Sequence, residues 1–291
     1  MRGHILGFLI SCCCLLPCVA EAQAQTSCQF QLFSAPQGYT DLLPLGINDY
    51  GNVVGLLDGL AGGTFGFVRY NDGTWKMYQA HPPYATWFSG RNDSGITVGA
   101  YDSPTGTHGL VLYQGVLRTV DYPGATYTAL TGINRYGTIV GYHVDAHGNS
   151  HGFKLQNGQF YSINYPGALS TTPQGISDLG TIVGLYQLTS GGNPHAFVRS
   201  AGIYRSFSDP QGTSGTELHG ANTSAVLFGN YLEPSFIFPA AFRYKNGAFQ
   251  NIVVSGSTST TLGSNNNKGN IVGRAYYQSS GEVNGFIASC Q

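Results

Sequence analysis

A ten-residue phrase recurs six times along this chain and constrains its fold more than any other feature. The clearest copy runs from Gly132 to Gly141 and reads Gly-Ile-Asn-Arg-Tyr-Gly-Thr-Ile-Val-Gly. The first glycine of each copy serves as an anchor, and successive anchors are 44, 42, 43, 45 and 43 residues apart. A period in the low forties fits one propeller blade of four short strands, so six copies predict a six-bladed β-propeller. The anchors are Gly46, Gly90, Gly132, Gly175, Gly220 and Gly263.

The third copy indicates how one repeat divides into strands. Alternating segments run from Thr128 to Gly132, Thr138 to His143, His151 to Leu155 and Phe160 to Ile163, and Asn157-Gly158 is typical of a two-residue hairpin between the last two. No segment keeps a helical period, and the 42 glycines interrupt the chain at short intervals. The chain is therefore predicted to be all-β, with a stacked solenoid as the remaining alternative.

The two ends of the chain distinguish a closed ring from a solenoid. After the sixth anchor only three strands follow, and the residues from Cys28 to Pro36 align with Gly158 to Pro166, the outer strand of the third copy. The N-terminal strand is therefore expected to complete the sixth blade. In the same alignment Cys290 falls on Asn157, so the two cysteines occupy the two positions of the hairpin turn. They are predicted to form a disulfide that closes the ring.

Residues 1–24 have the features of a secretory signal peptide. An apolar run from Ile5 to Ala20 is followed by a small-residue pattern that predicts cleavage after Ala24. Residues 25–291 would then form a single propeller domain in the periplasm or the extracellular space, where disulfides persist. The alternative is a lipobox-like sequence ending at Cys12, which would place a lipid on that cysteine.

Composition excludes several kinds of partner. Only 9% of the residues are charged and the formal net charge is -1, so no basic stripe is available and nucleic acid is not an expected partner. No later segment reaches the ~20 apolar residues that a transmembrane helix needs. The chain also lacks the serine-elbow, zinc-protease, phosphate-loop and dinucleotide motifs. We expect a monomer without a cofactor.

Three short histidine motifs carry a resemblance to a known family. His108-Gly109-Leu110, His151-Gly152-Phe153 and His195-Ala196-Phe197, together with the glycine phrase, resemble the bacterial extracellular HAF repeat. The resemblance covers nearly the whole mature chain and implies a repeat protein, with no catalytic residue to carry over. Three blades depart from it, because the histidine is replaced by Phe65, Ala240 and Asn284.

The same three histidines raise the question of a metal site. A residue that recurs in successive blades is placed by the packing of the repeat, and equivalent positions in adjacent blades lie too far apart to share one ion with bonds of ~2 Å. We therefore expect no metal site at His108, His151 and His195.

The longer loops define where binding residues are expected. In a four-stranded blade the turns between strands one and two and between strands three and four lie on one face, and the longer connections lie on the opposite face. Loops on a rigid scaffold commonly carry function. The candidate ligand-binding residues are Tyr84, Trp87, Tyr127 and His147, whose rings could stack on a sugar or simply pack between blades. The candidate catalytic residues are Glu217 and Glu233, both expected in loop regions.

Two hypotheses about function follow. The first is a secreted or envelope-associated scaffold that binds a glycan, a peptide or a cell-surface protein without catalysis. The alternative is a carbohydrate-active hydrolase or lyase that uses carboxylates near the mouth of the channel. The second needs two carboxyl groups that converge within about 5 to 9 Å. A cluster of non-repeated charged and aromatic side chains at one mouth of the channel would mark the site in either case.

Overall fold

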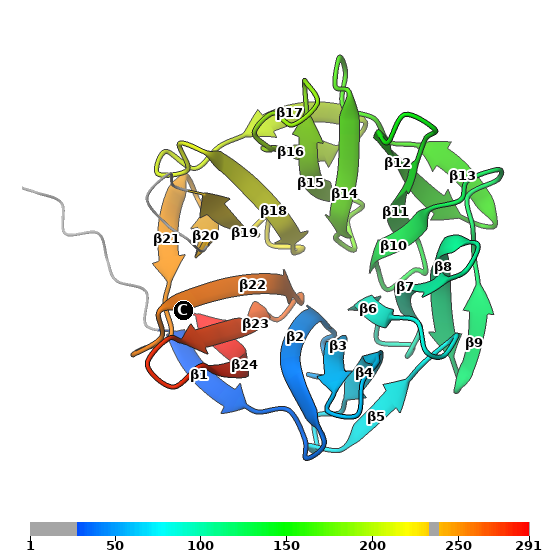
Figure 1. Ribbon diagram of the computed structural model, residues 1–291. Coiled ribbons are helices and arrows are strands. Elements are labelled where there is room, and N and C mark those ends of the chain that lie inside the picture. Colours follow the sequence, from blue (N-terminus) through cyan, green and yellow to red (C-terminus); the bar gives the residue numbers. More distant parts are fainter. Residues whose placement is uncertain (1–27, 233–238, 291) are drawn as a thin grey trace, which may run out of the picture.

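The computed structural model of the protein describes residues 28–232 and 239–290, which form six four-stranded antiparallel sheets around a central axis (Figure 1). Each sheet is one blade, and its first strand lies next to the axis. The predicted six-bladed all-β propeller is confirmed. The third blade also has its four strands within one residue of the predicted bounds.

The strands follow one another in chain order through the first five blades. Blade one contains β2 (Tyr39–Ile47), β3 (Val53–Gly59), β4 (Thr64–Arg69) and β5 (Trp75–Tyr78), and blade two β6 (Thr86–Arg91), β7 (Thr97–Ser103), β8 (Gly106–Tyr113) and β9 (Val116–Thr119). Blade three contains β10 (Thr128–Ile133), β11 (Ile139–Val144), β12 (Ser150–Gln156) and β13 (Gln159–Ser162), and blade four β14 (Ser170–Ile176), β15 (Ile182–Gln187), β16 (His195–Ser200) and β17 (Ile203–Phe207). Blade five contains β18 (Gly215–Ala221), β19 (Leu227–Leu232), β20 (Ala240–Lys245) and β21 (Ala248–Ile252).

Blade six joins the two ends of the chain. It contains β22 (Ser259–Asn265), β23 (Asn270–Tyr277) and β24 (Glu282–Cys290), and β1 (Cys28–Phe33) is its outer strand. β1 pairs with β24 in register, with Cys28 opposite Cys290, and a disulfide joins the two cysteines. The predicted closure is confirmed, because a covalent bond replaces the hairpin turn that connectivity cannot supply.

A bulge next to the axis explains the glycines of the repeat. In every blade the register between the first and second strands shifts by one residue just before the anchor. The shift presses the first-strand backbone against the last glycine of the phrase, so that a Cβ on Gly141 would lie 2.2 Å from the carbonyl oxygen of Ala129. In blade six the register puts Ser264 at the anchor position, one residue after the predicted Gly263.

The hydrophobic core is divided into layers between neighbouring blades. One layer combines Val98 of blade two with Leu130, Ile139 and Phe153 of blade three. Phe153 is fully buried, and so are its counterparts on the third strands of the other blades, namely Phe67, Leu110, Phe197, Phe242 and Phe286. Each blade is therefore held by packing against the faces of its neighbours.

Candidate functional site

The six anchors narrow the central channel. A Cβ on Gly90 would lie 3.3 Å from the Cα of Gly132, and a Cβ on Gly132 would lie 3.2 Å from the Cα of Gly175. The channel is narrowest at the anchors, which separate the opening on one face of the ring from the opening on the other. We call the end at the turns between first and second strands the turn-side mouth, and the end at the longer connections the loop-side mouth.

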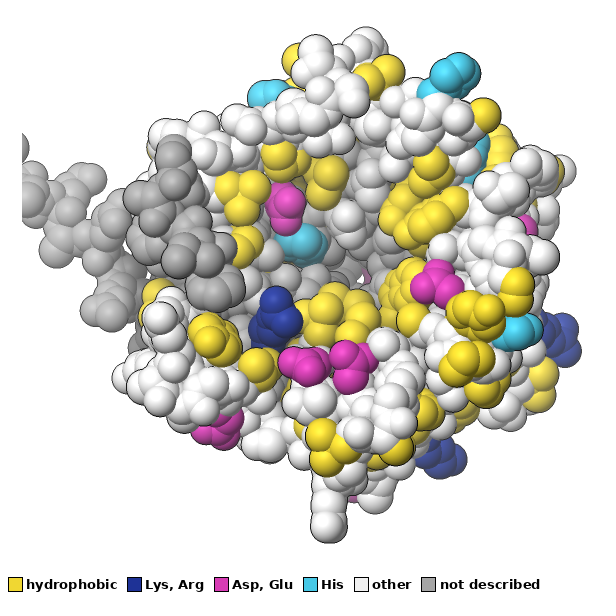
Figure 2. Space-filling model, viewed as in Figure 1, with side chains coloured by type: hydrophobic (Ala, Val, Ile, Leu, Met, Phe, Trp, Pro, Cys, Tyr) yellow, Lys and Arg dark blue, Asp and Glu magenta, His cyan; other side chains and the backbone are white. Residues whose placement is uncertain are grey.

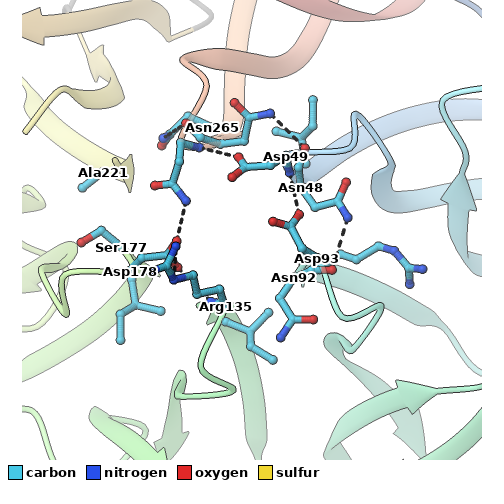
Figure 3. Close-up of a pocket in the computed structure, with 15 residues that line it drawn as sticks. Asn48, Asp49, Asn92, Asp93, Arg135, Ser177, Asp178, Ala221 and Asn265 are labelled. Atoms are coloured by element: carbon cyan, nitrogen blue, oxygen red, sulfur yellow. Dashed lines mark hydrogen bonds and ion pairs between the residues drawn. The ribbon is translucent and has the colours of Figure 1, made fainter. Parts of the chain in front are cut away.

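Asparagines of the repeat link adjacent blades at the turn-side mouth (Figure 3). The Asn48 side chain donates to the carbonyl of Asn92 at 3.2 Å, Asn92 donates to Asn134 at 3.2 Å, and Asn134 donates to Ser177 at 3.3 Å. Asn266 donates to Asn48 at 2.9 Å and joins the last blade to the first. The asparagine of the repeated phrase is therefore a structural tie between blades.

Three aspartates line the cavity of about 60 Å³ at this mouth. Asp93 Oδ1 accepts from the amide of Asp49 at 2.9 Å, and Asp49 Oδ1 accepts from the amide of Asn267 at 2.8 Å. Asp178 Oδ1 accepts from the amide of Arg135 at 2.9 Å. Burial, with repulsion from Asp49 and Asp178, raises the pKa of Asp93. One oxygen of each carboxylate thus fixes the turn of a neighbouring blade, which gives these acids a structural role that the sequence analysis missed.

The loop-side mouth carries side chains that the repeat does not dictate. Figure 2 shows a hollow at the centre of the ring, with acidic, histidine and basic side chains on its wall beside hydrophobic ones. Glu217 and His219 lie on β18, the innermost strand of blade five. Trp87 lies on β6 of blade two and, like Glu217, stands three residues before its anchor. Blades two and five are opposite each other in the ring, so Trp87 and Glu217 stand on innermost strands across the channel from each other.

His219 has two competing neighbours. Asn230 Nδ2 lies 3.0 Å from His219 Nε2, and Glu217 Oε2 lies 3.5 Å from the same nitrogen. The amide of Asn230 is oriented by two bonds to the backbone of Leu262, which donates to Oδ1 at 3.0 Å and accepts from Nδ2 at 3.3 Å. Asn230 and Glu217 therefore compete for this one nitrogen: a bare Nε2 accepts from Asn230, whereas an Nε2–H donates to Glu217.

The contact between His219 Nε2 and Glu217 Oε2 favours the charged form of the Glu217 carboxyl. A hydrogen bond from His219 lowers the pKa of the Glu217 carboxyl, and it outweighs burial, which acts in the opposite direction. The carboxylate is therefore ionised at neutral pH. A depressed pKa is typical of a carboxylate that binds or orients, whereas a general acid needs a raised pKa.

The depressed pKa predicts how the stability contribution of Glu217 changes with pH. Its ionised form stabilises the fold fully above the unfolded-state pKa of about 4.3, and this contribution is lost as the pH falls through the lower folded-state pKa. We expect Glu217→Gln to lower the free energy of unfolding by about 1 kcal/mol near pH 6, less than a full charged hydrogen bond because burial offsets part of it. Thermal melts from pH 6 to about pH 3 should show the difference from wild type shrinking; a constant difference would contradict the assignment.

The other predicted ligand-binding residues lie in the connections around blades two and three. Tyr84 is 37% exposed and lies against His81, with ring centroids 5.5 Å apart. Tyr127 stacks on Tyr142, and their hydroxyl oxygens are 3.2 Å apart. The His147 side chain is 86% exposed. These three residues come from separate connections, and only Trp87 lies on an innermost strand.

The two predicted catalytic glutamates have different outcomes. Glu217 was expected in a loop, but it lies within β18, because the strand begins two residues earlier at Gly215. Glu233 lies outside the described residues. Asn230 was not predicted as a site residue, although the loss of the repeated phrase in blade five was a signal that could have indicated it.

The repeated histidines pack against rings of the adjacent strand. His108 pairs with Tyr101, His151 with His143, and His195 with Tyr186, at centroid distances of 5.2 to 5.4 Å. His108 also contacts Asp121 at 2.8 Å and His151 contacts Asp145 at 3.0 Å. Among residues 28–232 and 239–290, no three His, Cys, Asp or Glu side chains are arranged to hold a metal ion. The same ranges contain no helix with the length and hydropathy of a membrane span.

Comparisons with known proteins identify the fold but no family. No family model matches the chain, and no curated protein matches it. Among solved structures, TolB from Acinetobacter baumannii is 14% identical with a TM-score of 0.59, and the match covers 83% of this chain but only 64% of that one. The resemblance to HAF repeats therefore remains a prediction from the sequence.

Two further structures carry other kinds of function on the same fold. Aleuria aurantia lectin, determined in complex with Fucα1-6GlcNAc, is 11% identical over 88% of this chain and 96% of that chain, with a TM-score of 0.54. A gluconolactonase from Xanthomonas campestris is 13% identical over 86% of each chain, with a TM-score of 0.53. At such identities the likeness shows the fold alone, and the site must decide the function.

Proposed function

We propose that this protein is a non-enzymatic binding propeller that recognises a glycan at its loop-side mouth. The observation that carries the proposal is the pairing of an ionised carboxylate, Glu217, with the Trp87 indole on the opposite wall of the channel. A pyranose has an apolar face that stacks on an aromatic ring, and hydroxyls that donate to a carboxylate. Arg274 on β23, whose cross-strand neighbour is Thr261, adds a cationic donor next to blade five.

The surroundings of Trp87 support a binding role over a packing role. Within the described residues, Trp87 belongs to none of the six hydrophobic clusters and stacks on no other aromatic ring, whereas Trp75 packs on Phe33 and Phe67. Trp87 is nevertheless only partly exposed. An aromatic side chain at a channel mouth that stacks on no other ring and remains partly exposed is typical of a ligand platform.

The state of Glu217 favours binding over hydrolysis. A glycoside hydrolase of the common type needs one carboxylic acid with a raised pKa and a second carboxylate nearby. The pKa of Glu217 is instead lowered by His219. The disulfide is typical of an oxidising compartment, and with the signal-like residues 1–24 it supports action outside the cytoplasm, where glycans are abundant.

A glycan array on residues 25–291, with a parallel assay for new reducing ends, tests the proposal. We expect binding without cleavage. Trp87→Ala and Glu217→Gln should each weaken the best ligand by at least about tenfold, the loss of about 1.4 kcal/mol that a stacked ring or charged contact provides. Matched controls are Tyr161→Ala on the outer strand β13 and Glu282→Gln at the start of β24, which should change affinity less than about twofold.

The hydrolase alternative gives a different result in the same experiment. Release of reducing ends by the wild type that Glu217→Gln abolishes would replace the proposal with catalysis by Glu217. Absence of binding to any glycan would move the proposal to a peptide or a surface protein as the ligand.

A further inference from the structure

A further cavity lies at the rim of blade three, away from the channel. It has a volume of about 280 Å³. One wall is the crossover from blade two, Tyr122 to Thr126, and the other is the end of β11 with its following loop, His143 to Ala146. The crossover is held in place because the amide of Val144 donates to the carbonyl of Tyr127 at 3.2 Å.

His143 offers this cavity both a donor and an acceptor. Its ring stacks on Tyr122, with centroids 3.9 Å apart and planes 12° apart. Burial and the nearby His151 lower the pKa of His143, so the imidazole is neutral at pH 7 and has one N–H donor and one bare nitrogen. Neither ring nitrogen forms a hydrogen bond within the described residues.

Asp145 places a fixed negative charge on the same wall. Its Oδ1 accepts from the backbone amides of His147 and Asn149 at 2.8 and 2.9 Å, and its Oδ2 lies 3.0 Å from His151 Nε2 and accepts from Asn149 Nδ2 at 3.3 Å. The hydrogen bond from His151 and these amides hold the pKa of Asp145 well below its usual range. The rest of the lining is mostly apolar or backbone, from Pro123, Gly124, Ala125, Val144 and Ala146.

Blade four has the equivalent crossover and strand but different side chains, so the repeat alone does not place the polar groups of the blade-three cavity. Tyr165 and Ala168 stand where Tyr122 and Ala125 stand in blade three. Tyr186 replaces His143, stacks on Tyr165 at 3.7 Å, is buried, and donates its hydroxyl to Ser206 at 3.0 Å. The Tyr186 hydroxyl of blade four thus has a hydrogen-bond partner within the protein, whereas the two ring nitrogens of His143 in blade three have none among the described residues.

We infer that the rim cavity of blade three is a second binding site that takes one neutral hexopyranose residue of a glycan. Apolar lining suits the C–H face of the sugar, and His143, whose ring carries one donor and one acceptor, suits the hydroxyls of the sugar beside the fixed charge of Asp145. The volume is at the small end of ligand sites and fits one ring but not two. The site does not depend on the loop-side mouth, and a glycan that reached both would bind with enhanced avidity.

The test fills the cavity and uses blade four as its control. Methyl glycosides of common hexopyranoses at millimolar concentration are the probes, followed by saturation-transfer NMR and by amide shifts of ¹⁵N-labelled protein. We expect at least one probe to shift the amides of residues 122–126 and 143–147. Ala125→Trp should weaken that binding by at least about tenfold, while Ala168→Trp, the same change in blade four, should alter it by less than about twofold.

A second variant controls for misfolding of Ala125→Trp. His143→Tyr copies the stacked tyrosine pair that blade four already contains, and it removes both ring nitrogens, so it should also abolish the shifts while the melting temperature stays near that of wild type. Glu217→Gln should leave the rim shifts unchanged, which separates this site from the loop-side mouth. Wild-type protein without shifts at residues 122–126 and 143–147, or shifts that survive both Ala125→Trp and His143→Tyr, would overturn the inference.

Discussion

We expect Cys28→Ser to lower the melting temperature of the protein by several degrees. The disulfide closes a loop of 262 residues, so its loss frees the unfolded chain by up to about 5 kcal/mol in the loop-entropy model. It also leaves β1 attached to blade six only by its ladder with β24 and by packing of Phe30 and Phe33. At about 2–4 °C per kcal/mol for a chain of this size, differential scanning calorimetry should detect the change easily.

The double variant Cys28→Ser/Cys290→Ser provides the control for this result. A reductant should lower the melting temperature of the wild type toward that of the double variant and leave the double variant unchanged. If Cys28→Ser melted at the wild-type temperature, the disulfide would not be what holds the ring closed.

Gly141→Ala should destabilise the protein by at least about 3 kcal/mol, the upper end of what overpacking usually costs. The new methyl would lie 2.2 Å from the carbonyl oxygen of Ala129 and 2.9 Å from the Phe153 ring. Neither can move, because Ala129 is held in the ladder between β10 and β11 and Phe153 is fully buried. Chemical denaturation of the variant and the wild type measures the difference.

The matched control changes another glycine of the same repeat. Gly137 lies in the turn with φ of +79° and has no atom near the position of a Cβ. Gly137→Asn should therefore cost less than about 1 kcal/mol, since asparagine tolerates the left-handed region. Equal losses at Gly141 and Gly137 would show that the bulge does not explain the repeated glycine.

The fold could be predicted because its signals are local and repeated six times. The period sets the number of blades, and turn residues such as Asn157-Gly158 set the hairpins, so the strands of blade three lie within one residue of expectation. The closure followed from one alignment, in which Cys28 and Cys290 take the place of a turn. The bulge itself was not visible in the sequence, and in blade six the residue at the anchor is Ser264 rather than the predicted Gly263.

The candidate site was less predictable because it depends on departures from the repeat. Glu217 and Trp87 were among the candidate residues, but their positions on opposite innermost strands follow from the ring geometry. The roles of Asn230 and of the Asp93 carboxylate depend on contacts between different blades, with partners 32 and 44 residues away in the sequence. The rim cavity depends on one exchange, His143 for the tyrosine of blade four, whose effect appears only when the stacked ring beneath it is known.

The most direct test of the account is a crystal structure of residues 25–291 with the best ligand of the glycan array. The account predicts an intact sugar in the loop-side mouth, with one face of a ring on Trp87 and a hydroxyl donating to Glu217. A sugar bound only at the turn-side mouth, among Asp49, Asp93 and Asp178, would contradict it, and so would a cleaved product beside Glu217.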